Sequence, residues 1–242
     1  MNAGKPGEGE RREAKRETGR PNAAAGSAGA GGSGPGGTGA KVTGTKVTGA
    51  KTRGDRPARE RIVDAANRLF YREGIRAVSV DAVADEAGVT KKTLYYHFRS
   101  KDDLVAEYLA SRDQPNLALF ASWFDRTEGD LADKVEAIFT ELARSARHPK
   151  WKGCGFLRTA AELANMPGHP AMRIGAGHKK KFEDWIAGQF AGSGMENPAA
   201  IARQVVLLMD GAFSTMLVHR DAAYAEEAGR AAGGIVRAAA RG

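Results

Sequence analysis

Apolar residues recur at intervals of three and four positions through most of residues 57–242, and no stretch shows the strict alternation expected of a strand. This spacing predicts an all-α chain. The first helix is expected to begin at Pro57, whose fixed φ suits a helix start, and to end before Gly74. Its inward stripe consists of Ile62, Ala66, Leu69 and Phe70.

Two short helices joined by a glycine are expected to follow. Ser79 is a favourable N-cap for the first of them, and Gly88 can adopt the positive φ that ends it. Thr90 can cap the second helix immediately afterwards. Two helices joined in this way predict a helix-turn-helix, a motif that places its second helix in the major groove of DNA. The apolar positions of the first short helix are Val80, Val83, Ala84 and Ala87.

The second short helix has two different faces. Leu94 and Phe98 lie four positions apart and can anchor it in a core. Lysines neutralise phosphate charge, and tyrosines can contact phosphate oxygens or thymine methyl groups. The alternative is a solvated helical face without a partner. The predicted outer face is cationic and aromatic, with Lys91, Lys92, Tyr95 and Tyr96 projecting outward and Thr93 and His97 beside them.

A fourth helix is predicted from Ser100, which can form a capping box with Asp103. Lys101 in its first turn opposes the helix dipole, so we interpret Lys101 as a residue that serves a partner such as a phosphate. Leu104 and Tyr108 face inward, and this helix is the natural connection between the helix-turn-helix and the rest of the chain.

The region from about residue 114 to 242 is helical throughout by the same pattern. One helix is expected to start after Pro115, and Pro149, Gly192 and Pro198 mark further ends and starts. The apolar residues of the predicted helices are Phe120, Trp123 and Phe124; Val135, Ile138, Phe139 and Leu142; Phe156, Leu157 and Leu163; Phe182, Trp185, Ile186 and Phe190; Ile201, Val205, Val206, Leu208, Met209, Phe213 and Leu217; and Tyr224, Ile235 and Val236.

Residues 1–56 differ in composition and are predicted to be a disordered, glycine-rich basic tail. They hold 15 of the 31 glycines and no aromatic residue, and they carry eleven Lys and Arg against five Asp and Glu. Such a segment buries too little apolar surface to offset its chain entropy. A basic arm beside DNA and an inert tail both remain open interpretations. The domain prediction is therefore a tail over 1–56, a helix-turn-helix domain over 57–111 and a helical bundle over 112–242.

Charge and cysteine content indicate which partner and which cell compartment to expect. The formal net charge is +8, most of it in the tail, so the clustering of Lys91, Lys92, Arg99 and Lys101 supports DNA binding better than bulk charge does. One cysteine allows no intrachain disulfide, which suits a reducing cytoplasm. No apolar run approaches the roughly eighteen residues of a membrane span, and no signal peptide is recognisable, so no membrane partner is expected.

Few residues in the sequence suggest a redox, catalytic or metal-binding site. Cys154 lies between two glycines at a predicted helix start near Lys150 and Lys152, where a thiolate would be favoured, and it is a candidate redox sensor. The alternative is a small buried apolar residue. No recognised catalytic motif is present, so no enzyme activity, cofactor or metal is expected. The histidines without metal-ligand spacing are His148, His169, His178 and His219.

Residues 61–109 resemble the DNA-binding domain of the TetR family of bacterial transcriptional regulators. The resemblance implies a three-helix DNA-binding domain and a C-terminal bundle for ligand binding and dimerisation. It rests on Ile62-x-x-Ala65-Ala66-x-x-Leu69-Phe70, Gly74, Ser79-Val80-x-x-Val83-Ala84, Ala87-Gly88-Val89-Thr90-Lys91-x-Thr93-Leu94-Tyr95-Tyr96-His97-Phe98 and Ser100-Lys101-x-x-Leu104. The expected DNA-binding residues are Ser79, Thr90, Lys91, Lys92, Thr93, Tyr95, Tyr96, His97 and Lys101.

The same resemblance implies a homodimer and a small-molecule inducer. Two late helices of each protomer form the interface in that family, and the helices around Phe182–Phe190 and after Pro198 are expected to expose surplus apolar surface; the alternative is that both are core. An apolar inducer pocket is expected in the bundle, although its candidate residues could equally be core. They are Trp123, Phe139, Trp151, Phe156, Trp185, Met209 and Phe213, with Met216 beside them.

These expectations describe a ligand-responsive dimeric transcriptional regulator, most simply a repressor released from a palindromic double-stranded DNA operator by its inducer. Its half-sites would lie about one helical turn, or ~34 Å, apart. Two other classes remain open: a small-molecule-binding or enzymatic bundle with a vestigial head, and a nucleoid-like protein that binds DNA without sequence preference through its basic tail.

Overall fold

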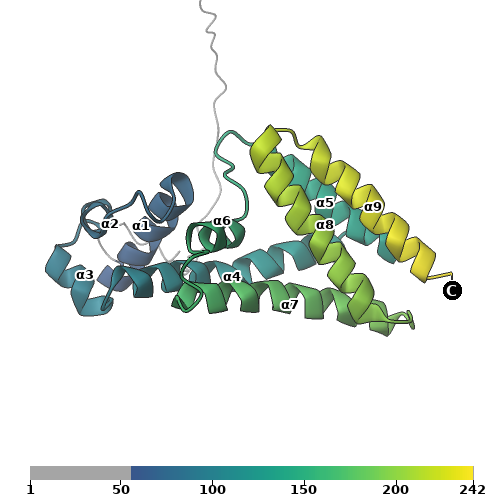
Figure 1. The fold of residues 1–242 in the computed structure, drawn as a ribbon, viewed down its shortest axis with the longest axis horizontal. Helices are drawn as coiled ribbons and strands as arrows, with labels where there is room; N and C mark the ends of the chain where they lie inside the picture. Colours follow the sequence, from purple (N-terminus) through teal and green to yellow (C-terminus); the bar gives the residue numbers. More distant parts are fainter. Residues whose placement is uncertain (1–55, 242) are drawn as a thin grey trace, which may run out of the picture. The chain divides into compact units, whose positions relative to one another are not determined.

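The computed structural model describes residues 56–241, and the predicted tail therefore lies outside the described residues except for Arg56. Within these residues the chain forms helices and no strand, which confirms the all-α class (Figure 1). The helices are α1 (Ala58–Glu73), α2 (Val80–Ala87), α3 (Lys91–His97), α4 (Lys101–Asp125), α5 (Leu131–Ala146), α6 (Gly155–Glu162), α7 (Pro170–Gly192), α8 (Pro198–His219) and α9 (Ala223–Ala239).

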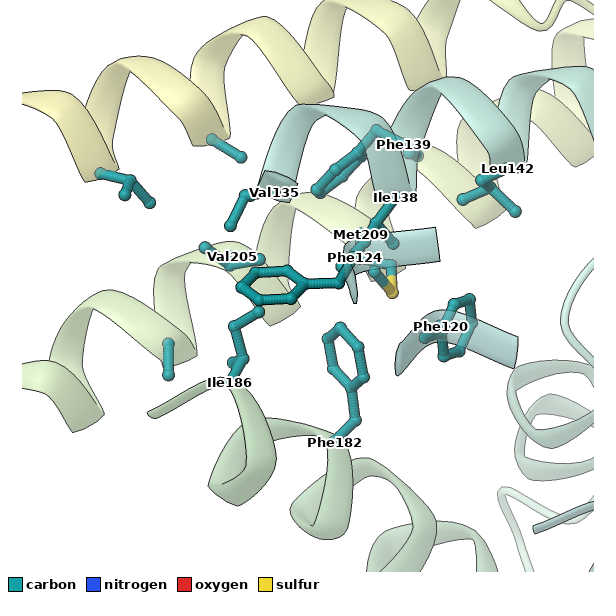
Figure 2. Close-up of a cluster of buried hydrophobic side chains, with 14 of the residues drawn as sticks. Phe120, Phe124, Val135, Ile138, Phe139, Leu142, Phe182, Ile186, Val205 and Met209 are labelled. Carbon is teal, nitrogen blue, oxygen red and sulfur yellow. The ribbon is translucent and has the colours of Figure 1, made fainter. Parts of the chain in front are cut away.

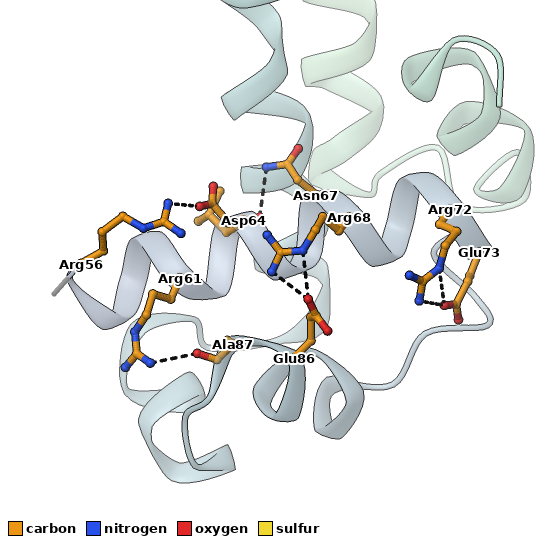
Figure 3. Close-up of polar contacts among 10 residues, drawn as sticks. Arg56, Arg61, Asp64, Asn67, Arg68, Arg72, Glu73, Glu86 and Ala87 are labelled. Carbon is orange, nitrogen blue, oxygen red and sulfur yellow. Dashed lines mark hydrogen bonds and ion pairs between the residues drawn. The ribbon is translucent and has the colours of Figure 1, made fainter. Parts of the chain in front are cut away.

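Helices α1, α2, α3 and the first half of α4 form the N-terminal head. The predicted stripe of α1 is buried, and Ser79 accepts a hydrogen bond from the Ala82 amide to cap α2. Gly88 ends α2 in the left-handed region at φ 64°, a conformation that costs other residues about 1–2 kcal/mol. Arg61 donates to the carbonyl oxygens of Ala87 and Gly88 at 3.0 and 3.1 Å. This arginine therefore ties the turn of the helix-turn-helix to α1 (Figure 3).

The second half of α4 packs with α5, α7, α8 and α9 into a C-terminal bundle. Its core is aromatic, with side chains from several helices converging in Figure 2. Phe120 lies 5.2 Å from Phe182 between ring centroids, in an edge-on arrangement that suits aromatic pairs. The fully or almost fully buried members include Phe124, Val135, Ile138, Phe139, Ile186, Phe190, Val205, Met209 and Met216.

The prediction of a new helix after Pro115 is wrong, because α4 continues from Lys101 to Asp125 with Pro115 inside it. A proline there removes one backbone hydrogen bond, to the carbonyl of Ser111. Both halves of α4 are held by tertiary contacts, since Leu109 is buried in the head and Phe120 in the bundle. These contacts outweigh the local loss, and the predicted domain boundary between 111 and 112 falls within one helix.

The expectation of surplus apolar surface on α7 is also wrong. Phe182, Ile186 and Phe190 are at most 3% exposed, because α7 lies between α4 and α8. The exposed large apolar side chains of the late helices are instead Leu207 and Val218 on α8 and Tyr224 on α9. Among the late helices, the outward large apolar side chains therefore lie on α8 and α9, and α4 adds Leu119.

Helix α8 bears on the expectation that no segment of the sequence spans a membrane. By length and composition alone it is able to cross a membrane, and it is the one such helix among residues 56–241. The observation is weak, since a core helix passes the same test, and Val205, Met209 and Met216 of α8 are buried in the bundle.

Helix α6 joins the two cores. Phe156 and Leu163 belong to the core of the head, whereas the N-cap residue Cys154 packs against both cores. At the other end, the Glu162 carboxylate accepts hydrogen bonds from the backbone amides of Ile75 and Arg76 at 3.2 and 2.9 Å. These bonds hold the α1–α2 connection to α6.

Candidate nucleic-acid interface

Helix α3 is short, and its orientation depends on a few anchoring contacts. Thr90 caps it by accepting a hydrogen bond from the Thr93 amide at 3.1 Å. Leu94 is the one buried residue within the helix, and Phe98, which follows it, is also buried. The guanidinium of Arg59 lies 5.3 Å from the centre of the Phe98 ring. Leu94 and Phe98 therefore act as the inward anchors that the sequence predicts.

The opposite surface of α3 is open. Tyr96 is 84% exposed and Tyr95 is 44% exposed, while Lys92 is exposed and has no ion-pair partner among the described residues. Large exposed side chains that lie together on one helix are informative, because they form a surface patch available to a partner. The His97 ring packs edge-on against Tyr96 with 5.1 Å between centroids. This face offers cationic and aromatic groups together, as a surface for phosphates and base edges requires.

Lys91 has a role that the sequence did not disclose. Its ammonium pairs with the Asp81 carboxylate of α2 at 3.0 Å, and the hydrogen bond and charge of Asp81 raise the pKa of Lys91. Both side chains are more than half exposed, so the pair adds little to stability. A DNA phosphate near Lys91 would compete with Asp81 for the same ammonium.

The remaining residues predicted to bind DNA lie at or near the starts of α2, α3 and α4. Ser79 and Thr90 use their side chains as caps, and both residues are exposed. Thr93 is half-buried, and its hydroxyl lies 2.9 Å from that of Thr90. Lys101 is partly buried in the first turn of α4; burial lowers its pKa, against an opposing contribution from Glu162.

A cavity of about 130 Å³ lies where α4, α5, α6, α7 and α8 meet. Of the residues predicted to line an inducer pocket, Trp123, Trp151 and Phe213 lie on its wall, and so does Cys154. The other four do not line it. Phe139 and Met209 are buried in the bundle core, Phe156 in the head core, and Trp185 packs on Phe124.

The polar wall of this cavity was missed by the sequence reasoning. Tyr71 from α1, Arg112 and Asn116 from α4, and His178 and Lys179 from α7 all line it. No local signal marks these residues, because they come from three helices and only the packing of those helices brings them together.

A buried polar network stands beside this wall. The His178 imidazole Nδ1 lies 2.8 Å from the Asp113 carboxylate, and Lys181 also pairs with Asp113. Burial lowers the pKa of His178, although Asp113 opposes the shift. Burial alone would raise the pKa of Asp113, but hydrogen bonds from Lys181 and His178 outweigh it and the pKa is lowered. His178 is therefore neutral near pH 7 and stacks on Phe156 with 3.8 Å between ring centres.

Three further features of the described chain are less informative. Cys154 is a free, half-buried thiol, and its role as a redox sensor stays a prediction. No cluster of three or more potential metal ligands occurs in residues 56–241. A larger hollow of about 390 Å³ lies between the start of α5, the α7–α8 connection and the end of α9. Its one basic residue, Arg237, is already paired with Asp133 and Glu136.

Comparisons with known proteins agree on one family. The sequence model of the bacterial regulatory proteins of the tetR family matches residues 62–108, from α1 to the first half of α4. YvkB of Bacillus subtilis, an uncharacterised HTH-type transcriptional regulator, is 36% identical over 95 residues, which are 39% of this chain and 48% of YvkB. SrpR of Pseudomonas putida, also an HTH-type transcriptional regulator, is 40% identical over 57 residues, 24% of this chain and 27% of SrpR.

The chain thus spans about half the length of YvkB and about a quarter of SrpR. A solved structure extends the similarity over the bundle. The TetR-family transcriptional regulator from Streptomyces coelicolor is 31% identical with a TM-score of 0.66, over 76% of this chain and 96% of that one. These relatives are named as transcriptional regulators and not as enzymes.

Proposed function

Because the chain belongs to the TetR family of bacterial transcriptional regulators, we propose that it is a ligand-responsive dimeric repressor that binds a palindromic DNA operator. The observation that carries the proposal is the outer face of α3, where Lys92, Tyr95 and Tyr96 are exposed while Leu94 is fully buried. A helix held from one side only, with its other face free, has the form needed to enter a major groove.

The contacts at the groove follow from this geometry. Lys92 and the N-terminal turn of α3 would reach phosphates and base edges, and Tyr95 and Tyr96 would add hydrogen bonds and ring contacts. Ser79, Thr90 and Lys101 lie at the starts of α2, α3 and α4, where exposed amides and side chains favour phosphate oxygens. DNA readout by these residues, with Lys91, Thr93 and His97, is part of the proposal.

Dimerisation is proposed through α8 and α9. Leu207 and Val218 are 68% and 74% exposed, so α8 presents two large aliphatic side chains outward. A Cβ added at Gly211 of α8 or Gly234 of α9 would meet open space, so nothing in the described chain requires these mid-helix glycines. Glycine lowers helix stability by about 0.5–1 kcal/mol relative to alanine, and close approach of a second protomer would explain its use here.

Ligand response is proposed through the cavity. Arg112 on the cavity wall belongs to α4, and α4 begins beside α3 in the head. Cys154 and Gly155, also on the wall, lie at the start of α6, and the end of α6 carries Glu162. A ligand that fits one arrangement of these helices better than another would change the separation of the two heads in the dimer. Coupling of this kind typically amounts to ~1–3 kcal/mol, or about 5- to 150-fold in operator affinity. The cell compartment that suits such a regulator is the cytoplasm.

The DNA proposal is tested by selecting bound fragments from a random duplex library and then measuring affinity for the selected site by gel shift. Lys92→Ala and Tyr95→Ala should each weaken binding by tenfold or more, since a good base contact contributes about 1–3 kcal/mol. Lys150→Ala is the matched control: it also removes one exposed lysine, but in the connection before α6. Circular dichroism should show unchanged helix content in all three.

Three results would contradict the proposal. Parent-like affinity of both α3 variants would show that another surface reads the DNA. Loss of all duplex binding on deletion of residues 1–55 would favour the nucleoid-like alternative, because the proposed head lies wholly outside that segment. An enzymatic bundle with a vestigial head would be favoured by turnover of a bound metabolite without retention of any duplex at low salt.

A further inference from the structure

Arg112 lines the cavity in a state that is unusual for an arginine. Its Nε is buried and has no hydrogen-bond partner, and the side chain makes no ion pair within residues 56–241. Its guanidinium lies over the rings of Tyr71 and Tyr108, 5.1 and 6.0 Å from their centres. A guanidinium remains charged at all physiological pH values, so this site holds an uncompensated positive charge.

The other cations on the wall are already accounted for. Lys179 pairs with Asp210 and lies over the Phe213 ring, and the lowered pKa of His178 leaves its imidazole neutral near pH 7. No aspartate or glutamate is among the described residues that line this cavity. Arg112 is therefore the one cation of the described wall that lacks an acidic partner in the fold.

Neighbouring groups favour an oxygen anion. The Tyr71 hydroxyl accepts a hydrogen bond from the Lys152 amide at 3.0 Å, which leaves its own proton free to be donated. The Asn116 side chain on the same wall offers two further N–H donors. A carboxylate suits this set, since arginine binds it with two parallel charge-assisted hydrogen bonds.

Most of the remaining wall is apolar, and the cavity is small. Trp123, Trp151 and Phe213 supply aromatic surface, and the volume is about 130 Å³. An apolar protein cavity of about 150 Å³ is known to accept benzene, so one aromatic ring is the appropriate size for the body of a ligand.

We infer that the cavity binds a single-ring aromatic carboxylate, with the carboxylate on Arg112 and the ring against Trp123, Trp151 and Phe213. The inference rests on the proposed function only in taking this ligand as the inducer. Binding neutralises this partly buried charge, and the ligand then bridges α4 to α8 and to the connection that precedes α6.

The probe pair is phenylacetate and its neutral isostere phenylacetamide. Titration near pH 7 is followed by tryptophan fluorescence, since Trp123 and Trp151 lie on the wall whereas Trp185 does not. Phenylacetate should bind at least tenfold more tightly than phenylacetamide to the full-length protein. Equal affinities, or no binding of either compound, would overturn the inference.

Variants assign the preference to one residue. Arg112→Gln should abolish the advantage of phenylacetate and leave phenylacetamide affinity within about twofold, while Arg112→Lys should restore part of it because the charge returns. Lys180→Gln removes a cation from the same helix, one that pairs with Glu183 and Asp184 and lies outside the described wall, and should preserve the preference. An acid preference that survives Arg112→Gln, or that disappears with Lys180→Gln, contradicts the assignment.

Operator binding is measured separately, which keeps the two proposals distinguishable. If the selected DNA is retained but phenylacetate shows no preference over phenylacetamide, the ligand class is wrong and the regulator proposal stands. If phenylacetate binds through Arg112 but no duplex is retained, the cavity assignment stands and the regulator proposal fails.

Discussion

Acidification should destabilise this protein through His178. In the unfolded chain a histidine has a pKa of about 6.5. In the folded protein burial lowers the pKa of His178, with Asp113 opposing the shift. Below pH 6.5 the unfolded chain therefore binds a proton that the folded chain excludes, and the free energy of unfolding falls as the pH falls.

The size of the effect has an upper limit. One proton of difference changes the free energy of unfolding by about 1.4 kcal/mol per pH unit. One unit below pH 6.5 about nine tenths of the unfolded histidine is protonated, so the slope from His178 is at most roughly 1.2 kcal/mol per unit. The lowered pKa of Asp113 acts in the same direction but at lower pH, since its contribution is present above about pH 4 and is lost below it.

The assay is urea unfolding of the parent and His178→Gln at about pH 7.5, 6.5 and 5.5. Every other residue is the same in both proteins, so the difference between the two slopes isolates His178. The variant should start less stable, because it loses the 2.8 Å contact with Asp113 and the stacking on Phe156, but should lose less stability on acidification. Equal slopes, or a parent that becomes more stable towards pH 5.5, would refute the reasoning.

Three further predictions concern separate parts of the chain. Leu94→Ala should lower the free energy of unfolding of the head by about 3–5 kcal/mol, measured by denaturation, because it removes the one buried side chain of α3; a loss below about 1 kcal/mol would show that α3 is held elsewhere. Lys101→Ala should reduce the slope of log affinity against log salt by about 0.9, as loss of one phosphate contact does, and an unchanged slope would remove Lys101 from the interface. Leu207→Glu should convert a dimer to a monomer in analytical ultracentrifugation with little change in helix content, whereas a persistent dimer would place the interface away from the centre of α8.

The sequence predicted the head well because its signals are local. Caps at Ser79, Thr90 and Ser100 act on amides within the next turn, and Gly88 supplies a positive φ wherever the chain goes afterwards. Leu94 on one face of α3 and Tyr96 on another follow from helical spacing alone. The resemblance to the TetR family rests on this same segment, so the class of protein was evident before its fold.

How distant residues meet depends on the packing of the helices. Pro115 predicts a helix end by local rules, yet packing on both sides carries α4 through it. The sequence shows that Phe182 and Phe190 are apolar positions of one helix. Whether they face the protein's own core or a partner depends on where α4 and α8 lie. Arg112 is an ordinary basic residue in the sequence. It becomes a partly buried charge without an acidic partner because α1, α6 and α7 pack around this part of α4, and burial, which sets the energy of a charge, is a property of the folded chain rather than of its neighbours in sequence.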